Sequence, residues 1–307
     1  MTKQHNYIWA MVIAAVFFWG SNFNAIAALD SDIPPIVSSL IRFVIASMVL
    51  IAVVPFVERG TTLSVKDYAY LLGLGFVGIF CFNYAIFAGM KETSAVNGAL
   101  IMASMPLVSV ILSKLFLNVK ISHYQRVGLL LAICGVFLVI TKGDYMALEY
   151  NLGDIWIMIA CVCGGLYAVL TKTLISHIPS GQATRWTVLF GTVFMFLTSL
   201  IQGDINYDYT SISLSSYALL GYMGILGTVL AYYFWITGCQ VLGPEKTSVT
   251  TNMIPLFTLV ISFILGQEIE TIQLIGTAII LLGVLFGSGY MNTFRPSSTS
   301  TSNVKSN

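Results

Sequence analysis

The stretch GFVGIFCFNYAIFAG at residues 75–89 has a counterpart, GILGTVLAYYFWITG, at residues 224–238. Identities between the two stretches, and beyond them, keep one offset of 149 residues. They pair Gly75 with Gly224, Gly78 with Gly227, Tyr84 with Tyr233, Gly89 with Gly238, Pro106 with Pro255 and Leu107 with Leu256. A constant offset over this many positions predicts a tandem duplication.

The composition places the chain in lipid. Charged residues make up 9% of the sequence and hydrophobic residues 57%, and the mean hydropathy is +0.87. A soluble domain carries roughly a quarter of its residues as charged side chains. The net charge of +1 provides no basic field for a polyanion, so nucleic acid is not an expected partner.

Ten apolar runs follow one another along the chain, each near the ~20 residues with which a helix crosses a bilayer. They lie at about residues 7–28, 34–56, 68–88, 93–117, 124–141, 153–175, 182–202, 215–238, 246–266 and 270–290. The predicted fold is therefore an all-α integral membrane protein with ten transmembrane helices. Residues 291–307, rich in Ser, Thr and Asn, are expected to form a disordered cytoplasmic tail.

Five spans per copy is an odd number, so the second copy has to enter the membrane in the opposite orientation. We therefore expect two inverted five-helix repeats, at residues 7–141 and 153–290. Inverted repeats can exchange inward-open and outward-open states, which is typical of transporters. The alternative for the first span, a cleaved signal sequence ending near Ala25-Ile26-Ala27, is disfavoured because the equivalent span at 153–175 lies inside the chain.

Basic residues predict the orientation. With ten spans, one set of connections and ends carries nearly all Lys and Arg side chains, whereas the opposite set carries mainly Asp and Glu. Because basic connections stay on the cytoplasmic side, both termini are predicted to be cytoplasmic, in a cell inner membrane. The lipid bilayer is thus the expected environment, and a monomer is the working assignment.

No catalytic machinery stands out. The sequence has no phosphate-binding loop, its histidines lie outside the spans, and no Asp or Glu lies in the middle of a span. All cysteines lie within spans, where we expect them to pack. We therefore expect no enzyme activity, no cofactor and no metal site.

Two prolines point to a substrate site. Pro106 and Pro255 fall at matched positions in the middle of spans, where each removes a backbone N–H and frees a carbonyl four residues earlier. Lipid cannot satisfy that carbonyl, so the kinked turns should face protein or a polar cavity. Matched interruptions in two repeats indicate a binding site between them, although an ordinary packing kink is the alternative.

Polar and aromatic side chains recur at helical spacing around these kinks. Amides, hydroxyls and aromatic walls together suit a small amphipathic solute. The candidate substrate-binding residues are Trp19, Asn22, Asn83, Tyr84, Asn97, Ser104, Tyr167, Tyr232, Trp235 and Asn252. For each of them, packing between helices or hydrogen bonding within its own helix is the alternative.

Arg42 is the one charged side chain well inside a span, and we expect a structural role for it, paired with helix-end carbonyls or, alternatively, with a substrate carboxylate. Six glycines are expected to form close helix contacts. They are Gly73, Gly75 and Gly78, with Gly221, Gly224 and Gly227.

In these residues the chain resembles the EamA-type branch of the drug/metabolite transporter superfamily. The resemblance is carried by Phe18-Trp19-Gly20, Ile41-Arg42-Phe43, Gln125-Arg126-Val127-Gly128, Pro255-Leu256-Phe257, Leu265-Gly266-Gln267-Glu268 and Gln273-Leu274-Ile275-Gly276, in order. It implies ten helices, a central cavity and alternating access. The Gly-Glu that the family often has after the fourth helix is replaced by Asn118-Val119 in the first repeat.

The sequence therefore favours a secondary transporter that exports small amphipathic metabolites, with amino acids foremost. The alternatives are a drug or lipid translocator of the same fold, and a membrane sensor or assembly protein that transports nothing.

Overall fold

The computed structural model describes residues 3–58, 62–105, 108, 111–112, 114–115, 123–140, 151–175, 177–242 and 250–287. The described part of the first half consists of α1 (Lys3–Ala27), α2 (Pro35–Val57), α3 (Val65–Leu74), η1 (Gly75–Cys81), α4 (Phe82–Met90), α5 (Ala95–Met102) and α7 (His123–Ile140). The second half has α8 (Leu152–Leu174), α9 (Ser180–Gln202), η2 (Asp204–Asn206), η3 (Tyr209–Ser211), α10 (Leu214–Gly224), η4 (Ile225–Leu230), α11 (Ala231–Leu242), η5 (Thr251–Met253), α13 (Ile254–Ile264) and α14 (Thr271–Gly287).

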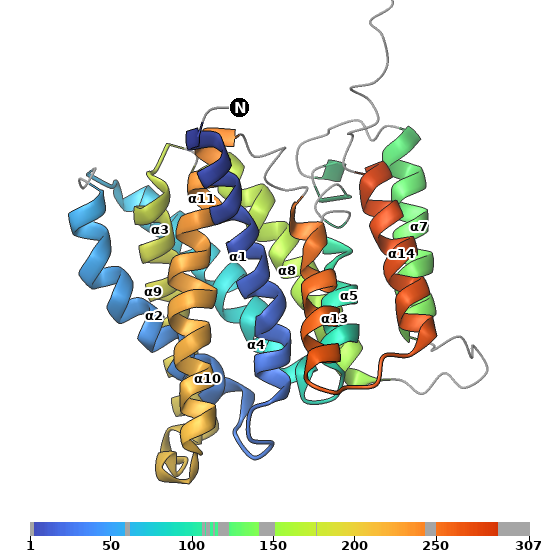
Figure 1. The fold of residues 1–307 in the computed structure, drawn as a ribbon. Coiled ribbons are helices and arrows are strands. Elements are labelled where there is room, and N and C mark those ends of the chain that lie inside the picture. Colours follow the sequence, from blue (N-terminus) through green and yellow to red (C-terminus); the bar gives the residue numbers. More distant parts are fainter. Residues whose placement is uncertain are drawn as a thin grey trace, which may run out of the picture.

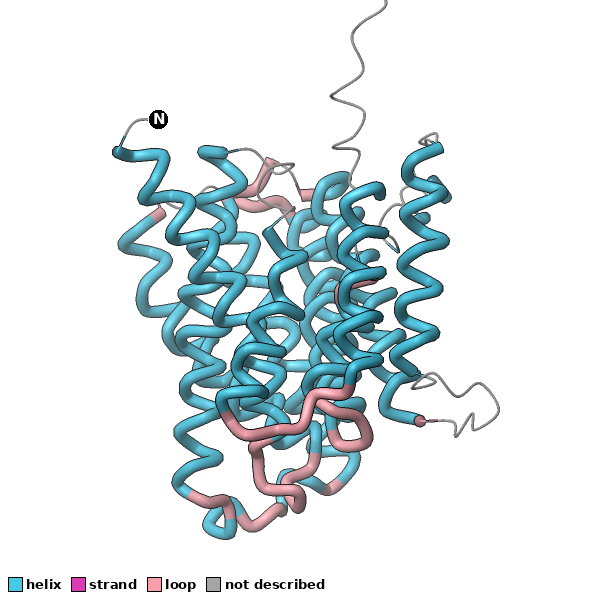
Figure 2. The backbone as a smooth tube through the Cα atoms, turned by 45° about the vertical axis from the view of Figure 1, so that its right-hand side comes forward, coloured by secondary structure: helices cyan, strands magenta, loops and turns pink. Residues whose placement is uncertain are grey.

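The helices stand side by side along one common direction, and their connections gather at the two ends of the bundle (Figures 1 and 2). Within the described ranges there is no strand, so the predicted all-α class is confirmed. Six helices are long and apolar enough to cross a membrane, and three shorter apolar helices accompany them. The count of ten spans stays a prediction, because the run at 93–117 is described only in part.

Two π-helical segments interrupt α-helices at matching positions of the two halves. The first, η1, joins α3 to α4, and the second, η4, joins α10 to α11. After η1 the N–H of Phe82 reaches the carbonyl of Val77, five residues earlier, in addition to that of Ile79. A π-helical turn inside an α-helix is a feature often found at functional sites. These segments coincide with the repeated stretches that begin at Gly75 and Gly224.

Glycines let other helices approach the two π segments closely. An added Cβ at Gly78 would lie 2.0 Å from Cδ2 of Tyr167, and one at Gly227 would lie 2.4 Å from Oδ1 of Asn22. Gly75 and Gly224 are equally enclosed, with Thr187 O at 2.7 Å and Arg42 O at 2.9 Å. The predicted close contacts are confirmed at these four glycines. They are wrong at Gly73 and Gly221, where nothing lies within 4 Å.

The halves pack against each other in matched pairs. In the first half α1 contacts α11 of the second half, and the equivalent helix of the second half, α8, contacts α4 of the first half. Swapping the two halves likewise turns the α1–α13 contact into the α8–α5 contact, and the α10–α2 contact into the α3–α9 contact. The equivalent helices α2 and α9 pack on each other, as do α7 and α14. Among the described residues, the largest buried apolar cluster is formed mainly by α1, α4, α5, α8 and α10.

Hydrogen bonds between buried side chains join the halves within this packing. Asn24 donates from Nδ2 to Thr258 O at 3.1 Å and accepts from Ser262 Oγ at 2.6 Å. The hydroxyls of Ser47 and Thr192 lie 2.9 Å apart between α2 and α9. Such bonds hold helices together in lipid, where apolar burial provides no net driving force. The Thr258 hydroxyl also donates to Gly20 O of α1 at 2.9 Å, so the hydroxyls of Thr258 and Ser262 both serve helix packing.

The glycine contacts lead to a test of stability. Replacing Gly78 or Gly227 by Ala should destabilise the protein by about 1–3 kcal/mol, because the new methyl group overlaps Tyr167 or Asn22. Gly73→Ala and Gly221→Ala are matched controls, which should be neutral or slightly stabilising because Ala favours a helix over Gly. Thermal unfolding of the purified variants measures the difference. Equal melting temperatures for all four would contradict the close packing.

Candidate functional site

Arg42 lies at the point where the two π-interrupted helices approach each other. Its side chain, on α2, is 6% exposed. Nε donates to Oγ1 of Thr228 in η4 at 3.2 Å, and Nη1 contacts Oδ1 of Asn83 in α4 at 3.5 Å. The guanidinium carbon also lies 5.1 Å from the ring centroid of Phe43 and 6.0 Å from that of Phe87. One buried cation thus connects equivalent helices of both halves.

The polar partners of Arg42 are each hydrogen-bonded to a backbone carbonyl of their own interrupted helix. Asn83 donates from Nδ2 to Ile79 O at 2.9 Å, and Thr228 donates from Oγ1 to Met223 O at 3.0 Å. Each bond fixes the side chain so that its oxygen, Oδ1 of Asn83 or Oγ1 of Thr228, lies against the guanidinium. The sequence analysis did not single out Thr228, although a hydroxyl next to a repeated glycine in an apolar run is a usable signal.

An aromatic wall lies beside this centre. The Trp19 ring on α1 lies 5.7 Å from Tyr232 and 5.1 Å from Trp235, both on α11. The Tyr232 hydroxyl is within electrostatic range of both Arg42 and the Tyr167 hydroxyl on α8. Trp19, Tyr232 and Trp235 of the predicted site are therefore in direct contact, and Tyr167 of the same set is a neighbour of Tyr232.

Asn22 completes the group from α1. It is 7% exposed and packs its amide against Gly227, the residue before Thr228. Its Oδ1 accepts no hydrogen bond from any residue that the structure describes. A buried amide oxygen without a donor costs about 1–3 kcal/mol, so a group that supplied the missing hydrogen bond would be favoured there.

Three other predicted site residues have partners of their own. Asn97 accepts a hydrogen bond from Nε2 of Gln273 at 2.9 Å. Ser104 donates to Ile101 O at 2.6 Å, within its own helix. The Tyr84 ring stacks on Phe80, with centroids 6.1 Å apart, and meets Trp156 edge-on. These contacts are the packing alternative that the sequence left open.

Of the two prolines predicted to kink their spans, the structure describes Pro255. Pro255 lies in the first turn of α13, directly after the 3-10 turn η5, which itself follows the helical residue Thr250. A proline is suited to this position because first-turn N–H groups have no intrahelical partner. Pro106 and the Asn252 side chain lie outside the described residues.

The two ends of the bundle are closed by related contacts. At one end Ser64 caps α3, and its N–H donates to Asp67 Oδ2 at 2.8 Å, while His177 of the second half contacts Asp67 Oδ1 at 2.9 Å. At the other end Ser213 caps α10, and its N–H donates to Oδ2 of Asp30, from the first half, at 3.0 Å. Each connection between the first two helices of one half thus closes on the third helix of the other.

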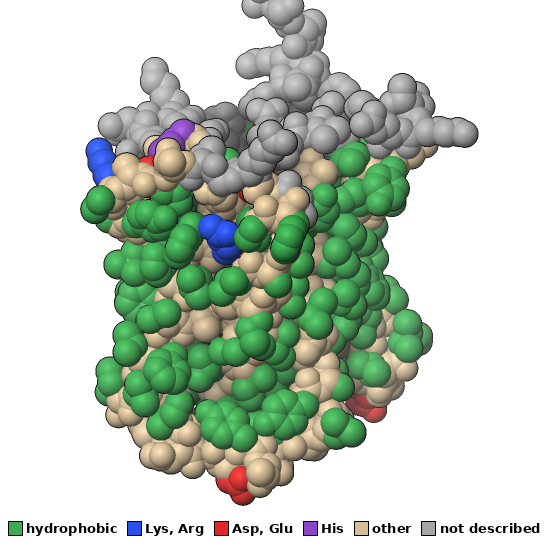
Figure 3. Space-filling view, turned by 90° about the vertical axis from the view of Figure 1, so that its left-hand side faces the viewer, with side chains coloured by type: hydrophobic (Ala, Val, Ile, Leu, Met, Phe, Trp, Pro, Cys, Tyr) green, Lys and Arg blue, Asp and Glu red, His purple; other side chains and the backbone are tan. Residues whose placement is uncertain are grey.

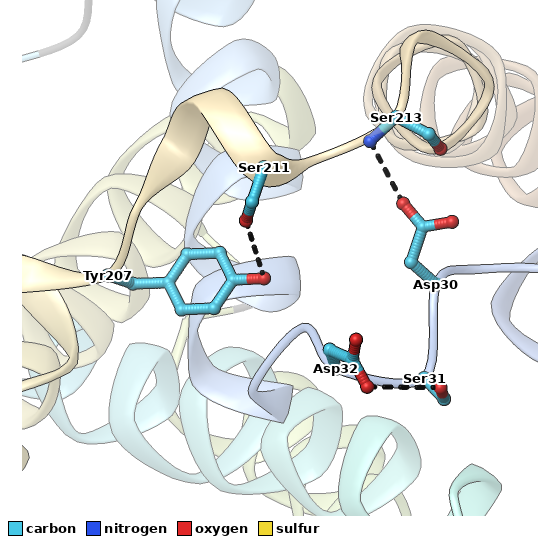
Figure 4. A pocket seen from close by; sticks show the side chains of 6 residues that line it. All are labelled: Asp30, Ser31, Asp32, Tyr207, Ser211 and Ser213. Atoms are coloured by element: carbon cyan, nitrogen blue, oxygen red, sulfur yellow. Dashed lines mark hydrogen bonds between the residues drawn. The ribbon is translucent and has the colours of Figure 1, made fainter.

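A cavity of about 360 Å³ lies at the second of these ends (Figure 4). It is lined by Asp30, Ser31, Asp32, Tyr207, Ser211 and Ser213. Hydrogen bonds from the hydroxyl and N–H of Ser213 hold the pKa of Asp30 below its ordinary value. The cavity contains none of the predicted substrate-binding residues and lies at the rim of the bundle. Within the described residues, no cluster of metal-binding side chains is found.

Comparison with known proteins agrees with this architecture. The model of the EamA-like transporter family matches residues 7–141 and again residues 151–288. The chain belongs to the EamA-like transporter family. It is accordingly a multi-pass membrane protein of a transporter family, as the motifs predict.

Relatives of this family member cover nearly the whole chain. The uncharacterized transporter YyaM of Bacillus subtilis is 33% identical, over 93% of this chain and 95% of its own. A probable terminal-alkyne amino-acid exporter of Streptantibioticus cattleyicolor is 24% identical, over 92% and 93%. A crystal structure with 18% identity superposes with a TM-score of 0.66, covering 95% of this chain and 99% of that one, and supports the fold.

The Asp30 contact predicts a pH-dependent contribution to stability. Because the folded-state pKa of Asp30 is lowered, its stabilisation is present at neutral pH and is lost as the pH falls below about 3.8, the ordinary value, through the folded value. Asp30→Asn should therefore lower the melting temperature at pH 7, with a difference from the wild type that shrinks towards pH 3. Asp32→Asn is the matched control, since Asp32 bonds only the exposed Ser31 hydroxyl in the described structure. An equal effect of both changes would rule out the capping contact.

Proposed function

We propose that this protein is a secondary transporter that exports small amphipathic metabolites, foremost amino acids, by alternating access. The observation that carries the proposal is the position of Arg42, which binds Thr228 of one interrupted helix and Asn83 of the other. Substrate sites at the interface of repeats, beside interrupted helices, are the arrangement that alternating access uses. The aromatic wall of Trp19, Tyr232 and Trp235 borders the same point.

Alternating access is supported by the exchange of partners between halves. Contacts such as α1–α11 and α8–α4 are interconverted when the two halves are swapped. A two-fold axis in the membrane plane would produce this pattern. The second conformation would then be reached by giving each half the internal arrangement that the other has now.

The chemistry of the lining residues supports an amphipathic solute. Aromatic rings provide apolar area, and the buried amides and the guanidinium provide a few orienting polar groups. The exporter from Streptantibioticus cattleyicolor acts, by its name, on an amino acid. An amino acid combines the same two features in one small molecule.

The orientation follows from the charges at the ends of the bundle. Basic side chains lie near the upper edge in Figure 3, and acidic side chains lie at the lower edge. Lys66 and Arg185 begin helices at the upper end, while Asp32 and Asp208 lie in connections at the lower end. We assign the upper end to the cytoplasm and the membrane to the cell inner membrane, because basic connections are retained on that side.

Reporter fusions test this orientation. A fusion at Lys66 should report a cytoplasmic location, and fusions at Asp32 and Asp208 should report the opposite side. The two acidic sites come from different halves, so together they test the inverted arrangement. A shared location for Lys66 and Asp208 would contradict it.

Counterflow in proteoliposomes tests transport itself. Vesicles preloaded with unlabelled amino acids should accumulate a radiolabelled amino acid, whereas protein-free vesicles should not. Trp235→Ala should weaken the apparent affinity for a bulky aromatic solute about tenfold, and that for a small solute less, because it removes apolar wall. Tyr233→Ala, at a neighbouring side chain that is 51% exposed, is the matched control and should leave both affinities unchanged.

The counterflow results distinguish the transport activity from the position of the binding site. Absence of counterflow for every amino acid in a folded preparation would refute amino-acid transport. Counterflow with equal effects of Trp235→Ala and Tyr233→Ala would retain transport and place the site away from the aromatic wall.

A further inference from the structure

The charge of Arg42 is not balanced by an acidic side chain within the described structure. Its partners there are a hydroxyl, an amide oxygen and two ring faces, all neutral. A buried cation in a membrane span is costly unless a counter-charge is available. A guanidinium has five N–H groups, of which the described hydrogen bonds use two, one of them at 3.5 Å.

Asn22 has the complementary deficit. Among the residues that the structure describes, the buried Oδ1 of Asn22 has no donor, and Arg42 has no acceptor that carries charge. The two groups adjoin consecutive residues of η4, since Asn22 packs on Gly227 and Arg42 binds Thr228. A carbonyl oxygen is a good acceptor for an ammonium group, and a planar guanidinium matches a carboxylate with two parallel hydrogen bonds.

We propose that Arg42 and Asn22 together select a zwitterion, with the solute carboxylate on Arg42 and its ammonium group on Oδ1 of Asn22. This inference rests on the proposed transport function and names the substrate class of the same site. The side chain of the solute then lies against Trp19, Tyr232 and Trp235. Compounds with only one of the two charges satisfy only one of the two deficits.

Access to Arg42 requires a change of conformation. The side chain is 6% exposed, and the α2 backbone at Arg42 lies against Gly224, just before η4. In the transport cycle, separation of α2 from η4 and α4 would release the contacts to Thr228 and Asn83. The incoming carboxylate replaces these weak neutral acceptors, so the cation has a partner in both states.

Two triplets of compounds test the proposal by competition for counterflow of a labelled amino acid. They are L-phenylalanine with phenethylamine and 3-phenylpropanoate, and L-leucine with isopentylamine and 4-methylpentanoate. In the wild type, the amino acid of at least one triplet should compete about tenfold or more better than its amine and its acid.

Variants then assign each charge to its residue. Arg42→Gln should reduce the preference for the amino acid over the amine towards one, with partial recovery in Arg42→Lys. Asn22→Leu should reduce the preference for the amino acid over the acid, and it should leave the preference for the amino acid over the amine unchanged. Ser47→Ala is the control, because it removes a buried hydroxyl of α2 that bonds Thr192 and not Arg42, and it should keep both preferences. Size-exclusion profiles and melting temperatures establish that each variant is folded.

The results discriminate between the two levels of inference. Absence of counterflow for every amino acid would overturn the proposed function and this inference with it. Counterflow with equal competition by amino acid, amine and acid, or with no competition by either triplet, would overturn the zwitterion site alone. Variants that weaken all competitors by one common factor would show that Arg42 and Asn22 only support packing.

Discussion

A bilayer interior offers no hydrogen bonds, and this constraint determines where the helices can be interrupted. Every carbonyl freed by a π turn has to be satisfied from within the protein. At the two interruptions Asn83 and Thr228 donate side-chain hydrogen bonds to Ile79 O and Met223 O. The oxygens of the same two side chains contact the guanidinium of Arg42, so the polar centre lies where both helices are interrupted.

Much of the fold could be predicted because its signals are local or periodic. The constant offset between Gly75 and Gly224 revealed the duplication, and apolar runs of about 20 residues revealed the spans. Composition alone gave the membrane class. The close contacts at Gly78 and Gly227 also followed, since small residues in a span indicate helix contact.

The candidate site was only partly predictable, because a helical stripe identifies a face but not the neighbour of that face. Trp19, Tyr232 and Trp235 do meet, whereas Asn97 bonds Gln273 and Ser104 bonds its own helix. A π turn adds one residue to the helical period, so positions after it rotate away from the face that a regular helix predicts. Thr228 lies within such a turn, and its contact with Arg42 of the other half is a long-range pairing that the sequence pattern alone does not specify.

The caps at the two ends show what fusion of the halves permits. Ser64 and Ser213 begin equivalent helices, yet the carboxylate on the first comes from Asp67 of its own helix and that on the second comes from Asp30 of the other half. An antiparallel homodimer of five-helix subunits would have identical residues at both ends of the bundle. In a single chain each end of the bundle can change alone, so one end has the imidazole of His177 where the other has serine hydroxyls. The relative stabilities of the contacts at the two ends of the bundle can therefore evolve without any change at its centre.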